Sequence, residues 1–229
     1  QVENVSTGLD GFCVFNNYVY GSARAEANGL CAFDVTNPTA PSFLTSFDNA
    51  VIYGHSVVSN GVLYYSDASA ISGLYIYSLS NPGAPGRLSS VACEKTKRIA
   101  VSGNVACLTT TDGMQVIDVS NPAAPVKRGF LQITGAPYDV ALQDTTLVPT
   151  NEERGIVVVD ISNMDSPLPL AEYAGIQLPR CVAVEGSKAY ISGTIGVEVL
   201  DLTDVSSPAS VGFYSLPMVN AWDIAVRNG

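Results

Sequence analysis

Residues 113–125 read Gly-Met-Gln-Val-Ile-Asp-Val-Ser-Asn-Pro-Ala-Ala-Pro, and this pattern is one of five copies along a chain of 229 residues. Each copy has a glycine, an apolar segment with Asp or Tyr near its end, and an Asn-Pro-x-x-Pro element or a close variant. The copies begin at Gly29, Gly73, Gly113, Gly155 and Gly196, which are 44, 40, 42 and 41 residues apart. A regular period of about 40 to 45 residues is typical of β-propellers.

The residues around each copy complete a unit of four strands. In the third copy, two apolar runs at 97–102 and 105–109 flank the turn Gly103-Asn104, which suits a tight hairpin. The glycine-led strand follows, and a fourth strand begins after Pro125. The sequence therefore predicts an all-β propeller of about 42-residue repeats, with third strands near residues 30–35, 74–79, 114–119, 156–161 and 197–202. We expect a single domain over 1–229, with blades at about 10–48, 54–92, 96–132, 137–174 and 179–215.

The polar residues of the repeat have a structural interpretation. Asn121 is suited to cap a turn with its side chain, Pro122 fits the second position of a type I turn, and Pro125 opens an edge strand. One aspartate recurs just before this element in four copies, at Asp34, Asp118, Asp160 and Asp201. Because it has the same place in each unit, we expect it to bind turn backbone or a neighbouring strand.

The copies resemble the LVIVD-repeat family of β-propellers. The resemblance is carried by residues 155–163 (Gly-Ile-Val-Val-Val-Asp-Ile-Ser-Asn) and 113–122, and it extends over about residues 10–226. It implies a propeller fold and says little about activity. Members of the family look like secreted or surface proteins of bacteria and archaea. The second copy departs from the pattern with Tyr77 in place of the aspartate, and the fourth has Met164 in place of the first proline.

The end of the sequence predicts one further strand. Residues 221–226 (Ala-Trp-Asp-Ile-Ala-Val) match the first strand of a blade, such as residues 137–142. Either this segment is the first strand of a sixth blade in a longer propeller, or it closes the ring. The predicted core is formed by alternate apolar residues of the first and third strands, including Val116, Val140, Val157, Val159, Val182, Val199 and Ile224.

Composition excludes several classes of partner. The net charge is −10 with only 14% charged residues, whereas nucleic-acid binding needs clustered Lys and Arg. No apolar run is long enough to span a bilayer. The five cysteines are too few for a disulfide scaffold, and none has C-x-x-C spacing. An acidic surface rich in Ser, Thr and Asn favours an extracellular or cell-surface location.

The candidate binding site lies where the first strands begin, because in a propeller these ends ring one mouth of the central channel. The copies agree at their apolar positions but differ here, where cations, acids and aromatic side chains gather. Such side chains are common anchors of interfaces. The candidate residues are Asp10, His55, Lys97, Arg98, Tyr138, Asp139, Arg180, Trp222 and Asp223. The alternative is that these side chains merely fill a solvated funnel.

Catalytic and metal-binding motifs are weak. His55 is the one histidine, so a two-histidine metal site is impossible, and its neighbour Ser56 points to the opposite face of a strand. Asp139 and Asp223 are the better carboxylate candidates for catalysis. Loop residues Asp112, Glu152 and Glu153 supply oxygen ligands for calcium, but no known calcium loop surrounds them. We predict no metal, no cofactor and no catalytic residue.

Two functions remain open at this point. The first is a non-enzymatic interaction or scaffold module, exported or on the cell surface, that binds a protein or glycan or builds an assembly, with self-association possible in principle. The alternative is a propeller-type enzyme that acts on a glycan or small metabolite at the channel mouth. The regular repeat favours the first, and the mixed chemistry of the candidate site favours the second.

Overall fold

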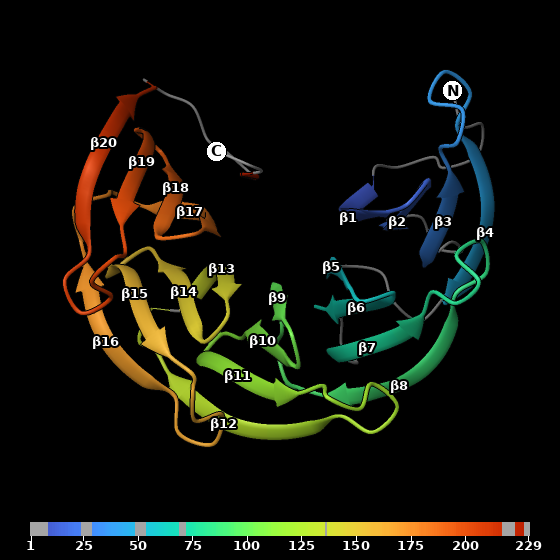
Figure 1. Ribbon diagram of the computed structural model, residues 1–229, viewed down its shortest axis with the longest axis horizontal. Helices are drawn as coiled ribbons and strands as arrows, with labels where there is room; N and C mark the ends of the chain where they lie inside the picture. Colours follow the sequence, from blue (N-terminus) through green and yellow to red (C-terminus); the bar gives the residue numbers. More distant parts are fainter. Residues whose placement is uncertain are drawn as a thin grey trace. The chain divides into compact units, whose positions relative to one another are not determined.

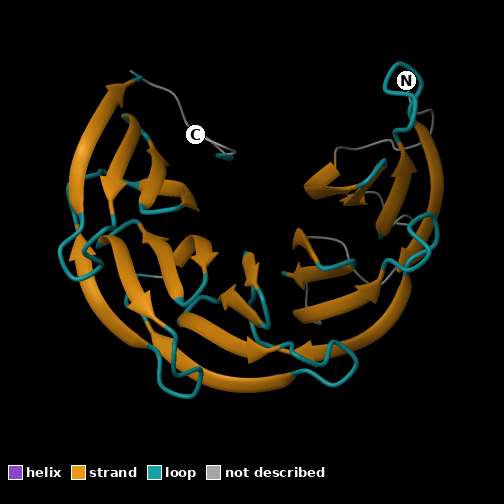
Figure 2. Ribbon diagram, viewed as in Figure 1, coloured by secondary structure: helices purple, strands orange, loops and turns teal. Residues whose placement is uncertain are grey.

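The chain forms a series of four-stranded antiparallel sheets, as seen in a computed structural model that describes residues 9–23, 29–48, 54–68, 72–135, 137–216 and 223–226. The described residues form five sheets and no helix (Figures 1 and 2). In every sheet the strands lie side by side in chain order. This is the meander of a propeller blade, so the predicted all-β class and the five four-stranded units are confirmed.

The strands have the following bounds. Sheet 1 contains β1 (Leu9–Phe15), β2 (Tyr18–Ala23), β3 (Leu30–Asp34) and β4 (Ser42–Asp48). Sheet 2 contains β5 (Gly54–Ser59), β6 (Val62–Asp67), β7 (Gly73–Ser78) and β8 (Gly86–Ala92). Sheet 3 contains β9 (Ile99–Ser102), β10 (Val105–Thr109), β11 (Gly113–Asp118) and β12 (Val126–Gln132). Sheet 4 contains β13 (Pro137–Gln143), β14 (Thr146–Asn151), β15 (Gly155–Asp160) and β16 (Leu168–Tyr173). Sheet 5 contains β17 (Pro179–Glu185), β18 (Lys188–Gly193), β19 (Gly196–Asp201) and β20 (Ala209–Ser215).

The further strand expected at residues 221–226 is not seen in the part of it that the structure describes. Residues 221 and 222 lie outside the described residues, and residues 223–226 belong to no strand. Ile224 and Val226 are nevertheless half-buried while Asp223 and Ala225 are exposed, so the expected alternation of apolar and exposed positions is kept. A strand is defined by its pairing with a neighbour, and alternation alone does not supply one.

The chain divides into two compact units. One comprises residues 1–104 with 119–126, and the other comprises residues 105–118 with 127–229. Strand β9 therefore belongs to the first unit, while β10 and β11 belong to the second. Each unit is described by itself below.

The turn between the third and fourth strands is held by its own side chains. The Oδ1 atom of Asp160 accepts a hydrogen bond from the Ser162 amide at 2.8 Å, and Oδ1 of Asn163 accepts one from the Asp165 amide at 3.1 Å. A backbone bond from the Ser166 amide to the Asn163 carbonyl closes the turn at 3.0 Å. Equivalent side-chain bonds occur at Asp34, Asn37, Asn121, Asp201 and Asp204. The predicted structural role of these residues is confirmed.

In the first unit, sheet 1 packs face to face against sheet 2. Their apolar cluster includes Leu30 and Ala32 from β3 and Leu63 and Tyr77 from β6 and β7. A hydrogen bond also joins the same two sheets. The Tyr20 hydroxyl donates to the Pro82 carbonyl, in the turn of sheet 2, at 2.9 Å.

In the second unit, sheet 4 packs against sheet 5 in the same manner. Ile156 and Val158 of β15 are completely buried in a cluster with Ile191 and Leu200 of sheet 5. Val116, Val140, Val157, Val159 and Val182 are also buried, which confirms their place in the predicted core. Val199 and Ile224 are only half-buried, so these two do not belong to the buried core.

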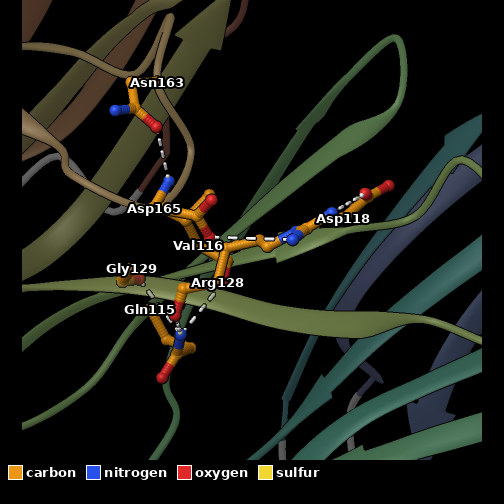
Figure 3. A network of polar contacts seen from close by, with 7 residues as sticks. All are labelled: Gln115, Val116, Asp118, Arg128, Gly129, Asn163 and Asp165. Carbon is orange, nitrogen blue, oxygen red and sulfur yellow. Dashed lines mark hydrogen bonds and ion pairs between the residues drawn. The ribbon is translucent and has the colours of Figure 1, made fainter.

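The capped turn of sheet 4 also seats on β12, the outer strand of sheet 3. The Gly129 amide donates to the Met164 carbonyl at 2.8 Å. A side chain at Gly129 would collide with the turn, because a Cβ atom there would lie 2.5 Å from Cδ of Pro167. Arg128 lies between Asp118 at 3.0 Å and Asp165 at 3.7 Å, and joins the strand to the turn (Figure 3). A small residue on the outer strand thus makes room for the next turn.

Two valines at the same repeat position allow a matched test of this packing. We expect Val158→Ala to reduce the free energy of unfolding by about 2 to 3 kcal/mol, through lost burial and a residual cavity. Val199→Ala should cost less than half as much, because Val199 is half-buried. Chemical denaturation at low protein concentration measures both values. Equal losses would contradict the burial difference.

The capped turns also predict a pH dependence. The hydrogen bond from Lys188, followed by those from Thr203, holds the pKa of Asp201 below its ordinary value. A lowered native pKa stabilises the fold above the ordinary Asp value of about 3.9, and this stabilisation is lost as pH falls through the native pKa. Melting temperature should therefore fall on acidification less steeply in Asp201→Asn than in the wild type. Parallel curves for the two proteins would contradict this expectation.

Candidate functional site

The predicted mouth residues of the first unit are His55, Lys97, Arg98 and Asp10. His55 and Arg98 are half-buried and Lys97 is exposed, whereas nothing is described of the Asp10 side chain. The backbone at His55 is fixed by Ser66 of β6, whose Oγ lies 3.3 Å from both the amide nitrogen and the carbonyl oxygen of His55. The same hydroxyl donates to the Lys97 carbonyl at 3.1 Å. The starts of these strands are therefore positioned by contacts between the Ser66 hydroxyl and backbone atoms, and not by the candidate side chains.

In the second unit the structure brings Tyr138 and Arg180 together. The Arg180 guanidinium carbon lies over the Tyr138 ring, 5.1 Å from its centroid. One guanidinium nitrogen of Arg180 lies 3.5 Å from Oε1 of Glu152, a residue of the β14–β15 loop. The side chains of Arg180 and Glu152 are 22% and 42% exposed, so the group is reachable from solvent. We call Tyr138, Glu152 and Arg180 the aromatic–arginine cluster.

Asp139 has a structural role within this site. Its Oδ2 atom accepts a hydrogen bond from the Val182 amide at 3.0 Å, which ties β13 to β17. Thr150 repeats the arrangement of Ser66, because its Oγ1 accepts from the Asp139 amide at 2.9 Å and lies 3.4 Å from the Arg180 carbonyl. Sequence reasoning missed these hydroxyls. A Ser or Thr in the second strand of every unit was the signal that could have found them.

The remaining candidates contribute less to the site. Trp222 lies outside the described residues. Asp223 is exposed, and its Oδ1 accepts a bond from the Ile224 amide at 2.9 Å. Asp112 is exposed in its loop, and Glu152 is paired with Arg180 instead of joining a calcium site. Among the described residues no three His, Cys, Asp or Glu side chains are grouped as metal ligands would be.

The aromatic–arginine cluster offers three kinds of contact in one place. The Tyr138 ring presents an aromatic face, Arg180 presents hydrogen-bond donors, and Glu152 presents acceptors. Aromatic rings and arginine are frequent energetic anchors of binding surfaces. The arrangement is therefore suited to hold a polar group with an apolar face.

In the described part of the chain, no helix is long and apolar enough to cross a membrane.

The role of Asp139 can be separated from that of the cluster. Asp139→Ala removes the acceptor of the Val182 amide, and we expect a loss of about 1 to 3 kcal/mol in unfolding free energy. Asp139→Asn keeps an acceptor oxygen and should lose less. Urea unfolding of the three proteins tests this. An alanine variant as stable as the wild type would contradict the structural role.

Comparison with solved structures shows the same fold in proteins of very different sequence. A functionally unknown protein from Desulfotomaculum acetoxidans DSM 771 is 12% identical with a TM-score of 0.79, and the match covers 92% of this chain and 71% of that one. The computationally designed Ika8 protein is 12% identical with a TM-score of 0.75, over 100% of this chain and 68% of that one. A protein from Lactobacillus plantarum is 13% identical with a TM-score of 0.70, over 86% and 66% of the two chains. At such identities the likeness concerns the fold alone.

Comparison of the sequence gives a family. No curated protein matches the chain significantly. The family model of the LVIVD repeat matches three stretches, at residues 13–49, 94–130 and 151–174. These stretches include capped turns of sheets 1, 3 and 4, the elements that carried the resemblance in the sequence. The chain belongs to the LVIVD-repeat family.

Proposed function

We propose that the protein is a non-enzymatic interaction module, exported or displayed at the cell surface, that binds a protein or glycan partner or builds an assembly. The observation that carries the binding proposal is the aromatic–arginine cluster. The ring of Tyr138 stacked beneath Arg180 is preorganised, since the cation–π contact and the ion pair to Glu152 hold the guanidinium in place. Preorganised anchors lose little freedom on binding.

The chemistry of the cluster favours a partner with both polar and apolar surfaces. A sugar ring has this character, because its C–H face can stack on an aromatic ring while its hydroxyls bond to Arg and Glu. A peptide segment with a carboxylate or amide could use the same donors. The acidic composition, with a net charge of −10, disfavours nucleic acid as the partner. The sparse charge of the chain supports an extracellular location.

The enzymatic alternative has less support from the site. Glycoside hydrolysis uses a pair of carboxyl groups that flank the scissile bond. Asp139 is engaged with the Val182 amide, and Glu152 is paired with Arg180. These carboxylates have structural partners that a catalytic role would have to displace.

Binding can be tested on a printed glycan array and, in parallel, on an array of extracellular proteins. The strongest ligand is then titrated by calorimetry against wild type, Tyr138→Ala and Arg180→Ala. We expect each variant to weaken affinity by about thirtyfold, as for truncation of an anchor residue.

Arg128→Ala is the matched control, because it removes another partly exposed arginine that pairs with Asp118 on the outer side of sheet 3. Its affinity should equal that of the wild type. Unchanged affinity in both Tyr138→Ala and Arg180→Ala would place the binding surface elsewhere.

A further inference from the structure

Leu178, in the loop that leads from β16 to β17, has a backbone conformation that is unusual for leucine. Its φ is +46°, in the left-handed region, where the Cβ atom of an L-residue is crowded. Pro179 follows directly, and a proline favours an extended φ of about −120° in the residue before it. The Leu178 side chain is also 44% exposed. Glycine or asparagine would be favoured on both counts, so packing and backbone geometry do not explain a leucine here.

The left-handed conformation belongs to the repeat, whereas the leucine does not. The corresponding loops contain Lys95, with a φ of +55°, and Gly135, with a φ of +85°. Lys95 is exposed as well, so this loop position faces solvent elsewhere in the chain. The backbone is thus kept while the side chain varies between copies, as expected of a position that serves recognition and not packing.

The loop that carries Leu178 is held firmly in place. Ile176 is 3% exposed and belongs to the apolar cluster between sheets 4 and 5, and Pro179 is buried. The loop also passes close to Gly193 of β18, because a Cβ atom at Gly193 would lie 2.8 Å from the Gln177 carbonyl oxygen. Leu178 is therefore an exposed apolar side chain on a fixed backbone, and such a group loses little freedom on binding.

A second exposed aliphatic side chain lies at the same end of sheet 5. Ile195, in the loop between β18 and β19, is 38% exposed. Pro179, directly after Leu178, pairs with Gly193, which is two residues before Ile195. The other four copies have polar residues at the repeat position of Ile195, namely Asn28, Ser72, Asp112 and Arg154. Sheet 5 thus presents aliphatic side chains to solvent where other copies present polar ones.

Leu178 adjoins the aromatic–arginine cluster. It is two residues before Arg180, so the two Cα atoms are at most about 7 Å apart. Arg180 lies where the pairing of β17 with β18 shifts register, and such a bulge changes the direction of a side chain. The register of β13 with β14 shifts in the same way around Tyr138. The cluster therefore has an aliphatic contact beside Arg180, in addition to the aromatic ring.

The carboxylates beside the cluster outnumber its cation. Glu152 and Glu153 are both exposed in the β14–β15 loop, and Glu152 is the one that pairs with Arg180. Glu153 lies beside Gly135, where a Cβ atom would be 2.9 Å from its Cδ, and it has no cationic partner among the described residues. A basic side chain of a partner would complete this arrangement, and the net charge of −10 favours such a partner.

We infer that the partner of the aromatic–arginine cluster is a protein segment, for which Leu178 is a further anchor. The segment presents large apolar side chains to Leu178 and Ile195, and a basic side chain to Glu153. A sugar ring stacks on an aromatic face but gains little from exposed aliphatic side chains, so a protein fits this set of groups better than a glycan does. The inference rests on the proposed function and narrows it to one class of partner.

A displayed library of short random peptides, selected on the wild-type protein, tests the class of partner. We expect the enriched peptides to combine a large apolar residue with Lys or Arg. The strongest peptide is then titrated by calorimetry against wild type, Leu178→Asn and Tyr138→Ala. Leu178→Asn should weaken affinity by about tenfold, and should have no further effect on a peptide whose apolar residue is changed to alanine.

Melting temperature separates recognition from folding. Asparagine adopts a left-handed φ more readily than leucine, so Leu178→Asn should raise the melting temperature by about 2 to 4 °C while affinity falls. Lys95→Asn is the matched control, because it makes the same change of backbone preference in the other compact unit. It should also raise the melting temperature, and it should leave peptide affinity unchanged.

The outcomes distinguish this inference from the proposed function. Peptide affinity that falls in Tyr138→Ala but not in Leu178→Asn would overturn the inference alone. The same holds for enriched peptides without an apolar–basic pair, for a lower melting temperature in Leu178→Asn, and for a glycan ligand that depends on Tyr138 when no peptide binds. Unchanged affinity in both variants would place the binding surface elsewhere and overturn the proposed function as well.

Discussion

The seating of a capped turn on the outer strand of the preceding sheet is the contact on which the other features of this protein depend. Asp160 and Asn163 hold the turn of sheet 4 through hydrogen bonds within the turn itself. Gly129 then lets the turn approach β12 closely enough for a backbone hydrogen bond. The turn and the apolar face of one sheet both contact its neighbour, so they fix its distance and its register together.

This contact explains the main features of the repeat. The two prolines stiffen a turn that must keep its shape when it docks. The small residue of the outer strand leaves the space into which the turn fits. The first strands are placed by a different device, the hydroxyls of Ser66 and Thr150 that join two strand starts through their backbone. Because the backbone does this work, side chains such as Tyr138 and Arg180 vary between units without disturbing the fold.

Much of the fold could be predicted from the sequence, because the period, the alternation within strands and the turn residues are local signals. The glycine-led strand around Val157 and the caps at Asp34 and Asn121 are examples. The segment at residues 223–226 shows the limit of such signals. Its alternation matched that of a first strand, but pairing depends on a neighbour that a local pattern does not report. The aromatic–arginine cluster was predicted in part, because alignment of the strand starts placed Tyr138 and Arg180 at the same mouth. The pairing of Arg180 with Glu152 could not be predicted, because only the fold brings these two residues together.

The stacking of sheets has an energetic consequence. Within each unit the described contacts join sheets that are consecutive in the chain, as the apolar clusters between sheets 1 and 2 and between sheets 4 and 5 illustrate. Proteins built in this way behave approximately as one-dimensional arrays, in which stability is a sum of terms for each repeat and for each junction. Local opening of such an array begins where a strand has few buried side chains, and β20, whose residues are all exposed, is then a strand whose amides should exchange readily with solvent.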